Sequence, residues 1–212
     1  MENQYYTLKP AVGTKETGMA YPAVESYEDY DFKGANSVYK LKSHLPARTN
    51  IDFRFKLAKK SRPTDFLSQV TIKGAGILIS PNLFNFINSY KIIPYQLFDV
   101  TIEANDKFLN YKYLHFIWED WHEYVDWKIS SFKLFENFEF TSIEINSYKQ
   151  YLEEVGKSEV FRVAPDKIVF FSIDFDLFNH PFIGENVLSN RLKEDISKAN
   201  GFTGLEMSSV NF

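Results

Sequence analysis

The chain has 212 residues and a mass of 24.8 kDa, the size of one domain or two small ones, and is long enough to bury a substantial apolar core. It contains no cysteine, which excludes disulfide frameworks, thiolate metal sites, cysteine nucleophiles and iron–sulfur clusters. The formal net charge of −4 argues against a general nucleic-acid-binding protein, because such binding needs clustered Lys and Arg facing phosphate.

The charges are unevenly distributed along the chain. Residues 40–73 carry nine basic and two acidic side chains, whereas residues 99–159 carry thirteen acidic and six basic ones. Blocks of this kind either form partner surfaces or face each other within the fold and cancel.

The first 45 residues are rich in Gly, Pro, Tyr and small polar residues and follow neither the helical nor the strand period. We predict an irregular or extended N-terminal arm over residues 1–45 and a single α+β domain over residues 46–212. The start of the chain lacks the basic segment and apolar run of a secretory signal, and no stretch approaches about 18 consecutive apolar residues. We therefore expect a soluble, cytoplasmic protein that does not enter a membrane.

Alternating apolar and charged residues predict a half-buried strand over residues 50–57. A short apolar strand over residues 77–79 leads into Ser80 and Pro81, a helix N-cap followed by a proline at the first helical position. The helix that follows has one apolar face, formed by Leu83, Phe86, Ile87 and Tyr90. A further strand is predicted over residues 96–102.

The rest of the chain is rich in strand patterns. These predict strands over residues 109–118, 125–135, 138–143, 161–163 and 168–171, a helix over residues 147–155, and a turn at Pro165 and Asp166. We predict an α+β fold, with a strand-rich mixed or antiparallel sheet and three or four short helices packed on it.

A pattern of one strand followed by a capped helix occurs twice in the sequence. Residues 78–83 match residues 187–192 at a separation of 109, and Ile87 matches Ile196 on the helix face. The second helix ends at Asn200 with a C-cap signal. Duplication and convergence of two capped helices both explain this similarity.

The order of these signals resembles the immunity-protein family of bacterial polymorphic toxin systems, in its cysteine-free branch. Residues 125–132 are similar to a Val-Asp-x-x-x-Ser-x-Phe segment of that family, and residues 160–162 follow as in its members. A closing family pattern is similar to Ser189, Leu192, Ile196, Thr203 and Gly204. The resemblance covers roughly residues 75–210. It implies a non-catalytic protein without a cofactor that binds and neutralises a cognate toxin, and it carries over no toxin-contact residue.

All three tryptophans and four of the acids fall within residues 118–127. Tryptophan dominates binding hot spots, and an acidic rim attracts a basic partner such as a nuclease toxin. The candidate partner-binding residues are Trp118, Glu119, Asp120, Trp121, Glu123, Asp126 and Trp127. The alternative is that the tryptophans lie in the core and the acids in a solvated turn.

Two other groups of residues have side chains suited to metal binding or acid–base chemistry. His115, Glu119 and His122 have spacings that would align them on a helix, but the preceding residues have a strand pattern and the HExxH order is absent, so we expect no metal site. Asp174 and Asp176 are predicted to share one face of a strand, where they are suited to acid–base catalysis or cation binding. The alternative is that they form the solvent-exposed face of an amphipathic strand.

The leading hypothesis is thus an immunity protein that acts by direct protein–protein binding, with no catalytic residue. The alternatives are a cation-dependent hydrolase, using Asp174 and Asp176 or the region from His115 to His122, and a general protein-interaction module. The pattern of residues leaves the toxin and the oligomeric state open.

Overall fold

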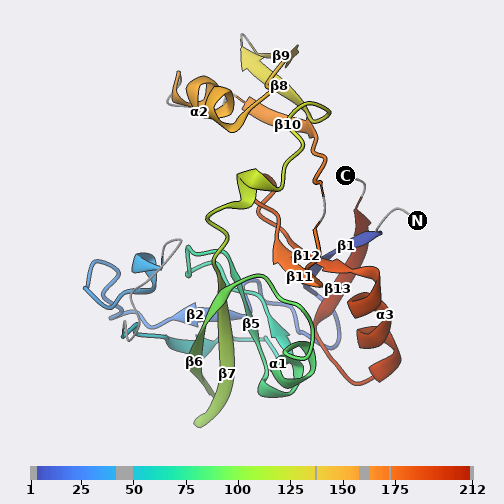
Figure 1. Ribbon diagram of the computed structural model, residues 1–212. Coiled ribbons are helices and arrows are strands. Elements are labelled where there is room, and N and C mark those ends of the chain that lie inside the picture. Colours follow the sequence, from blue (N-terminus) through green and yellow to red (C-terminus); the bar gives the residue numbers. More distant parts are fainter. Residues whose placement is uncertain (1–3, 42–49, 137, 158–162, 172, 211–212) are drawn as a thin grey trace. The chain divides into compact units, whose positions relative to one another are not determined.

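The computed structural model describes residues 4–41, 50–136, 138–157, 163–171 and 173–210 (Figure 1). The chain forms two compact units. The larger unit comprises Met1–Trp118, Phe175–His180 and Gly184–Val210, and the smaller unit comprises Glu119–Asp174, Pro181–Ile183 and Asn211–Phe212. The described residues form three sheets and three α-helices, which confirms the predicted α+β fold.

A six-stranded sheet forms one part of the larger unit. Its strands, in spatial order, are β2 (Val24–Ser26), β3 (Arg54–Leu57), β6 (Tyr95–Ala104), β7 (Lys107–Phe116), β5 (Gly76–Ile79) and β4 (Phe66–Leu67). Only β3 and β6 run parallel. The alternation predicted over residues 50–57 is confirmed, since Ile51, Phe53 and Phe55 are buried.

The long hairpin of β6 and β7 is closed by Asn105 and Asp106, both with positive φ. A two-residue turn of this kind matches the twist of the strands it joins, and Asn and Asp tolerate the left-handed conformation. The aromatic side chains of the sheet build its core. The ring of Phe53 lies 5.2 Å from that of Phe98 and 5.8 Å from that of Tyr113.

A four-stranded antiparallel sheet forms the other part of the larger unit. Its strands, in order, are β11 (Leu177–Asn179), β12 (Asn186–Ser189), β1 (Tyr5–Pro10) and β13 (Leu205–Val210). The structure differs here from the expected N-terminal arm, because β1 lies between two strands from the end of the chain. Only Thr7 and Leu8 of β1 are buried, and they are neighbours in the sequence. The strand therefore lacks the alternation of apolar and polar residues by which a strand is predicted.

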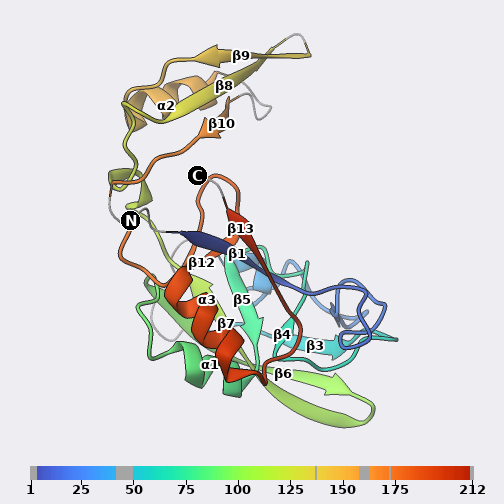
Figure 2. The same ribbon diagram turned by 90° about the vertical axis from the view of Figure 1, so that its right-hand side faces the viewer.

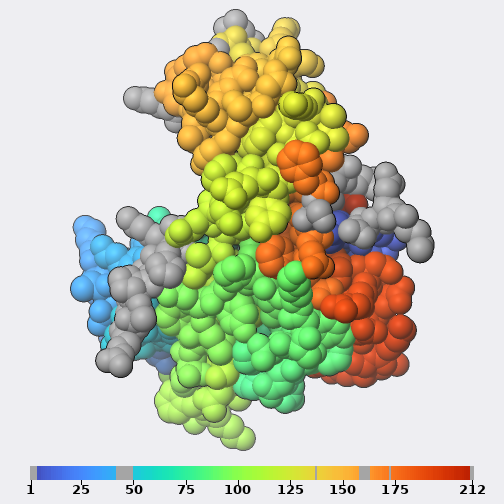
Figure 3. Space-filling model, viewed as in Figure 1, coloured from blue at the N-terminus to red at the C-terminus, as the bar shows by residue number. Residues whose placement is uncertain are grey.

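Two helices of the larger unit begin at serine N-caps, as predicted. Ser80 Oγ accepts the N–H of Leu83 at the start of α1 (Pro81–Ile87), and Ser189 Oγ accepts that of Leu192 at the start of α3 (Asn190–Ala199). The apolar faces are buried through Leu83 and Ile87 in one helix, and through Leu192 and Ile196 in the other. The two helices lie side by side and form adjoining parts of the surface (Figures 2 and 3).

The smaller unit is built on a three-stranded antiparallel sheet, ordered β10 (Val163–Lys167), β8 (Ser131–Glu136) and β9 (Glu139–Ile143). Helix α2 (Tyr148–Gly156) packs on one face, with the ring of Tyr151 5.9 Å from that of Phe132. The buried core comprises Val125, Phe132, Ile145, Val163 and Ile168. Residues 160–162, part of the family resemblance, lie outside the described residues.

Three predictions for the smaller unit were wrong. The strand expected over residues 168–171 is absent, because β10 ends at Lys167 and only an isolated bridge between Phe170 and Val125 follows. The strand expected over residues 125–135 begins only at Ser131, because Asp126 closes a turn in which its Oδ1 accepts the N–H of Lys128 at 3.1 Å. The turn expected at Pro165 and Asp166 is instead a bulge inside β10, where the register with β8 shifts. Proline is tolerated at such a bulge because it has no N–H to offer the ladder.

Candidate functional site

The candidate residues of the segment 118–127 are divided between the two units. Trp118 ends the first stretch of the larger unit, where its ring meets those of Phe175 and Phe178 edge-on at 6.1 and 5.5 Å. The other candidates, from Glu119 to Trp127, belong to the smaller unit. The segment is therefore not one continuous surface of a single unit.

Trp121 and Trp127 form the wall of an aromatic cluster on the smaller unit's core. The indole of Trp127 stacks on Phe132 at 5.7 Å, and its Nε1 donates to the carbonyl of His122 at 3.0 Å. The ring of Trp121 meets Phe182 edge-on at 4.9 Å. Both side chains are only partly buried. They thus pack against the core and remain partly accessible to solvent.

Three acids of this segment lie in or just before the 3-10 helix η2 (Trp121–Glu123). Glu119, Asp120 and Glu123 are exposed and form no ion pair with any residue that the structure describes. Asp126 is partly buried in its turn. His122, the middle residue of η2, stacks on Tyr148 with ring centroids 4.0 Å apart.

Acidic charge gathers in the smaller unit as a whole. That unit carries twelve acidic and six basic side chains, whereas the larger unit carries sixteen acidic and eighteen basic ones. The net charge of the protein therefore comes from the smaller unit. A surface of this sign attracts basic partners and raises their rate of association.

The β8–β9 hairpin exposes aromatic side chains that sequence patterns did not single out. Phe138 at the turn is 94% exposed, and Phe140 on β9 is 60% exposed, with its ring 4.9 Å from Phe135. In the described part of the sheet, β9 is an edge strand. The run Phe138-Glu139-Phe140 is visible in the sequence, but its place at an edge follows only from the order of the strands.

The residues of the hydrolase alternative are divided between the two units. Asp176 belongs to the larger unit and Asp174 to the smaller one, and His115 and His122 are divided in the same way. His115 is buried in β7 beside Ala75, with Nδ1 3.2 Å from the carbonyl of Ala75. Among the described residues, no group of three or more His, Asp or Glu side chains is placed to hold a metal ion.

Asp176 has a structural role that its contacts explain. Its carboxylate accepts hydrogen bonds from the Ser189 hydroxyl at 2.7 Å, from the N–H of Lys91 at 3.0 Å and from the Arg191 guanidinium. Burial alone would raise the pKa of this carboxyl, but these donors together hold the pKa below its usual range. The ionised carboxylate of Asp176 thus binds donors within the fold.

The basic block of residues 40–73 is partly neutralised within the larger unit. Arg54 pairs with Asp52 at 2.8 Å, and Lys56 pairs with Glu25 at 3.5 Å. Lys42 and Arg48 lie outside the described residues. In the described remainder of the block, Lys59, Lys60 and Arg62 are exposed and form no ion pair.

No helix among the described residues combines the length and apolar character needed to cross a bilayer. The sequence matches no model of a known protein family and no curated protein.

Proposed function

We propose that this chain is a cytoplasmic immunity protein, which neutralises a cognate bacterial toxin by direct binding and has no catalytic activity of its own. The observation that carries this proposal is the smaller unit, where an excess of acidic charge coincides with exposed aromatic side chains. A surface with aromatic anchors and an acidic rim is suited to a basic protein partner.

The first contact region is the acidic rim of the segment 119–127. Glu119, Asp120 and Glu123 are exposed and unpaired within the described fold, so their charge is available to a partner. A nuclease toxin carries a basic groove for phosphate groups, and an acidic inhibitor covers such a groove by mimicking the charge of the substrate.

The second contact region is the β8–β9 hairpin. Large exposed apolar side chains are an unfavourable arrangement in water unless a partner covers them, and an edge strand offers backbone groups to an added strand. Phe138 and Phe140 lie beside Glu136 and Glu139, so the same basic partner suits both regions.

The residues of the family resemblance have structural roles consistent with the proposal. Ser189 caps α3, Leu192 and Ile196 are its buried face, and Thr203 binds Asp65 through both its N–H and its hydroxyl at 2.9 Å. Such residues maintain a scaffold, and the contact surface is free to vary between members.

The direct test pairs this chain with the product of the neighbouring gene. Growth of cells that express that product should be rescued by this chain, and the two proteins should purify together. Reversing two charges, Glu119→Lys with Glu123→Lys, should weaken binding at least about tenfold, which corresponds to about 1.4 kcal/mol.

A matched control reverses two exposed acids of the larger unit, Glu28→Lys with Glu206→Lys, and should bind as the wild type does. Binding without rescue would favour the general interaction module. Equal loss in both double variants would show that only the overall charge matters and would remove the proposed surface.

A further inference from the structure

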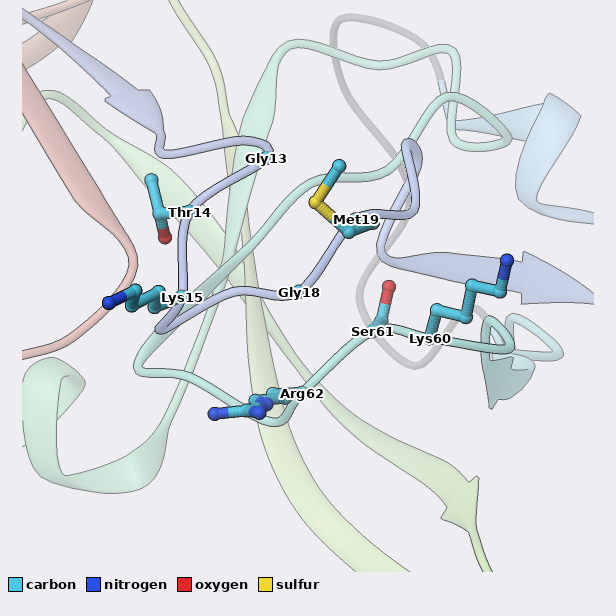
Figure 4. A pocket seen from close by; sticks show the side chains of 8 residues that line it. All are labelled: Gly13, Thr14, Lys15, Gly18, Met19, Lys60, Ser61 and Arg62. Atoms are coloured by element: carbon cyan, nitrogen blue, oxygen red, sulfur yellow. The ribbon is translucent and has the colours of Figure 1, made fainter.

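The larger unit contains an open hollow of about 490 Å³, lined in part by the basic block of residues 40–73 and separate from the two proposed toxin-contact regions (Figure 4). One wall is the loop between β1 and β2, which contributes Thr14, Lys15 and Met19. The other is the segment after β3, which contributes Lys60, Ser61 and Arg62. A volume of this size holds a small organic ligand.

The lining of the hollow is strongly basic. It includes Lys15, Lys60 and Arg62, and none of the described residues that line it is acidic. The three cations form no ion pair with any described residue. Glu16, beside Lys15 in the sequence, accepts the N–H of Gly204 at 2.8 Å and so has a partner of its own.

The cations stand on two sides of the hollow. Figure 4 shows the side chains of Lys15 and Arg62 extending to one side and that of Lys60 extending to the other. A ligand with several linked anionic groups offers one group to each side. The N–H groups of Lys15 and Glu16, in the same loop, donate to no described residue and add to the positive potential there.

The two walls are joined by backbone hydrogen bonds. The N–H of Met19 donates to the carbonyl of Lys60 at 3.0 Å, and that of Arg62 donates to the carbonyl of Thr17 at 2.9 Å. Gly18 lies against the opposite wall so closely that a Cβ atom there would stand 2.0 Å from the carbonyl oxygen of Lys60. The spacing of the two backbone segments that carry the cations is therefore set before any ligand arrives, which lowers the entropic cost of binding.

We propose that this hollow binds an oligophosphate, a chain of two or three linked phosphate groups, either free or as part of a nucleotide. Arg and Lys are the residues that bind phosphate oxygens, and Arg does so through two parallel hydrogen bonds. Met19, 73% exposed at the edge of the hollow, offers an apolar surface to a base or similar group.

Calorimetric titration with sodium tripolyphosphate and with orthophosphate tests this site. We expect one-to-one, saturable binding of tripolyphosphate, at least about tenfold tighter than that of orthophosphate, because the longer ion carries more charge and more phosphate oxygens for the cations to bind. Lys15→Ala with Arg62→Ala should weaken tripolyphosphate binding by about tenfold or more.

The control is Lys33→Ala with Lys107→Ala, which removes two exposed cations of the same unit away from the hollow. It should change the affinity less than about twofold. Unsaturable binding, or an equal loss in the two double variants, would overturn the proposal. All four residues are exposed, and unfolding curves will confirm that each variant is folded.

A nucleoside triphosphate and the variant Met19→Ala distinguish the two sources of the ligand. Weaker nucleotide binding but unchanged tripolyphosphate binding in Met19→Ala supports a nucleotide, and equal affinities for the two ligands in the wild type support a free oligophosphate. A single-stranded oligonucleotide that binds more tightly than tripolyphosphate, with affinity rising with its length, would overturn the small-ligand site in favour of a nucleic-acid backbone.

Discussion

Asp65 and Asp176 occupy equivalent positions in two copies of one hairpin-and-helix unit. Asp65 precedes β4 and accepts the Ser80 hydroxyl at 2.5 Å, and Asp176 precedes β11 and accepts the Ser189 hydroxyl at 2.7 Å. In each copy the serine N–H also donates to the carbonyl of its aspartate, at 2.8 and 2.9 Å. Each serine is the N-cap of the helix that follows.

The two copies are also joined reciprocally. Asp65 Oδ2 accepts the N–H of Thr203, which follows the helix of the second copy, at 2.9 Å. Asp176 Oδ2 accepts the N–H of Lys91, which follows the helix of the first copy, at 3.0 Å. Convergent capping explains a serine before each helix but does not require this exchange. The arrangement therefore favours duplication of an ancestral unit.

Replacement of Asp176 by asparagine should destabilise the larger unit. The change leaves the Arg191 guanidinium without its charged partner and replaces one acceptor oxygen by a donor facing other donors. We expect a loss of about 2 kcal/mol or more in the free energy of unfolding, measured by urea denaturation. The control Asp99→Asn breaks the exposed pair with Lys112 and should cost less than about 1 kcal/mol. Equal losses would contradict the role given to Asp176.

His180 should make stability depend on pH between about 6.5 and 4. The side chain is 1% exposed, and burial lowers its pKa to about 4. The unfolded chain takes up the His180 proton at higher pH than the folded chain does. The stabilising contribution of neutral His180 is therefore fully present above the pKa of His180 in the unfolded chain, and it is lost as the pH falls towards 4. The loss should be about 3 kcal/mol across this window.

The variant His180→Asn isolates this contribution, because asparagine does not titrate. Whatever its stability at pH 7, its free energy of unfolding should fall less steeply than that of the wild type between pH 6.5 and 4. Parallel curves would show that the pH dependence has another origin. Loss of the Asp176 contribution is expected only at lower pH, since the pKa of that carboxyl is depressed below its usual range.

Gly204 and Gly184 offer a matched test of backbone strain and crowding. Both have positive φ, at 75° and 66°, but a Cβ atom at Gly204 would stand 2.4 Å from Thr64 Oγ1, whereas one at Gly184 would meet nothing within 4 Å. We expect Gly184→Ala to cost about 1 kcal/mol, from its conformation alone, and Gly204→Ala to cost about 3 kcal/mol or more. Thermal unfolding of the two variants measures the difference, and a larger loss for Gly184→Ala would contradict it.

Local signals in the sequence were sufficient for several elements. The caps at Ser80 and Ser189 and the alternation from Ile51 to Phe55 depend on neighbours in the chain, and the structure confirms them. The position of β1 depends instead on pairing with strands near the other end of the chain, so Tyr5–Pro10 carried no decisive local pattern. Long-range pairing is set by the whole fold.

The candidate site shows the same limit. Composition located the acids and tryptophans of residues 118–127, but the chain passes from one compact unit to the other between Trp118 and Glu119. The exposed edge of β9 depends on strand order, which the sequence pattern does not reveal. Division into units and exposure of edges are properties of tertiary packing, so neither was predicted.

Substitutions at Trp127 and Phe138 should separate folding from partner binding. Trp127→Ala removes the stacking on Phe132 and the hydrogen bond to His122, and we expect it to destabilise the smaller unit by about 3 kcal/mol. Phe138 is almost fully exposed, so Phe138→Ala should change stability by less than about 0.5 kcal/mol.

If the β8–β9 hairpin contacts the toxin as proposed, Phe138→Ala should nevertheless weaken toxin binding by about tenfold or more. Phe108→Ala is the control, because Phe108 is also exposed, at 71%, but lies at the β6–β7 hairpin of the larger unit. Calorimetry with the purified toxin and denaturant unfolding of each variant give the two quantities separately. Unchanged toxin affinity in Phe138→Ala would exclude the hairpin tip from the interface, and the exposed acids Glu119 and Glu123 would then be the remaining contact region to test.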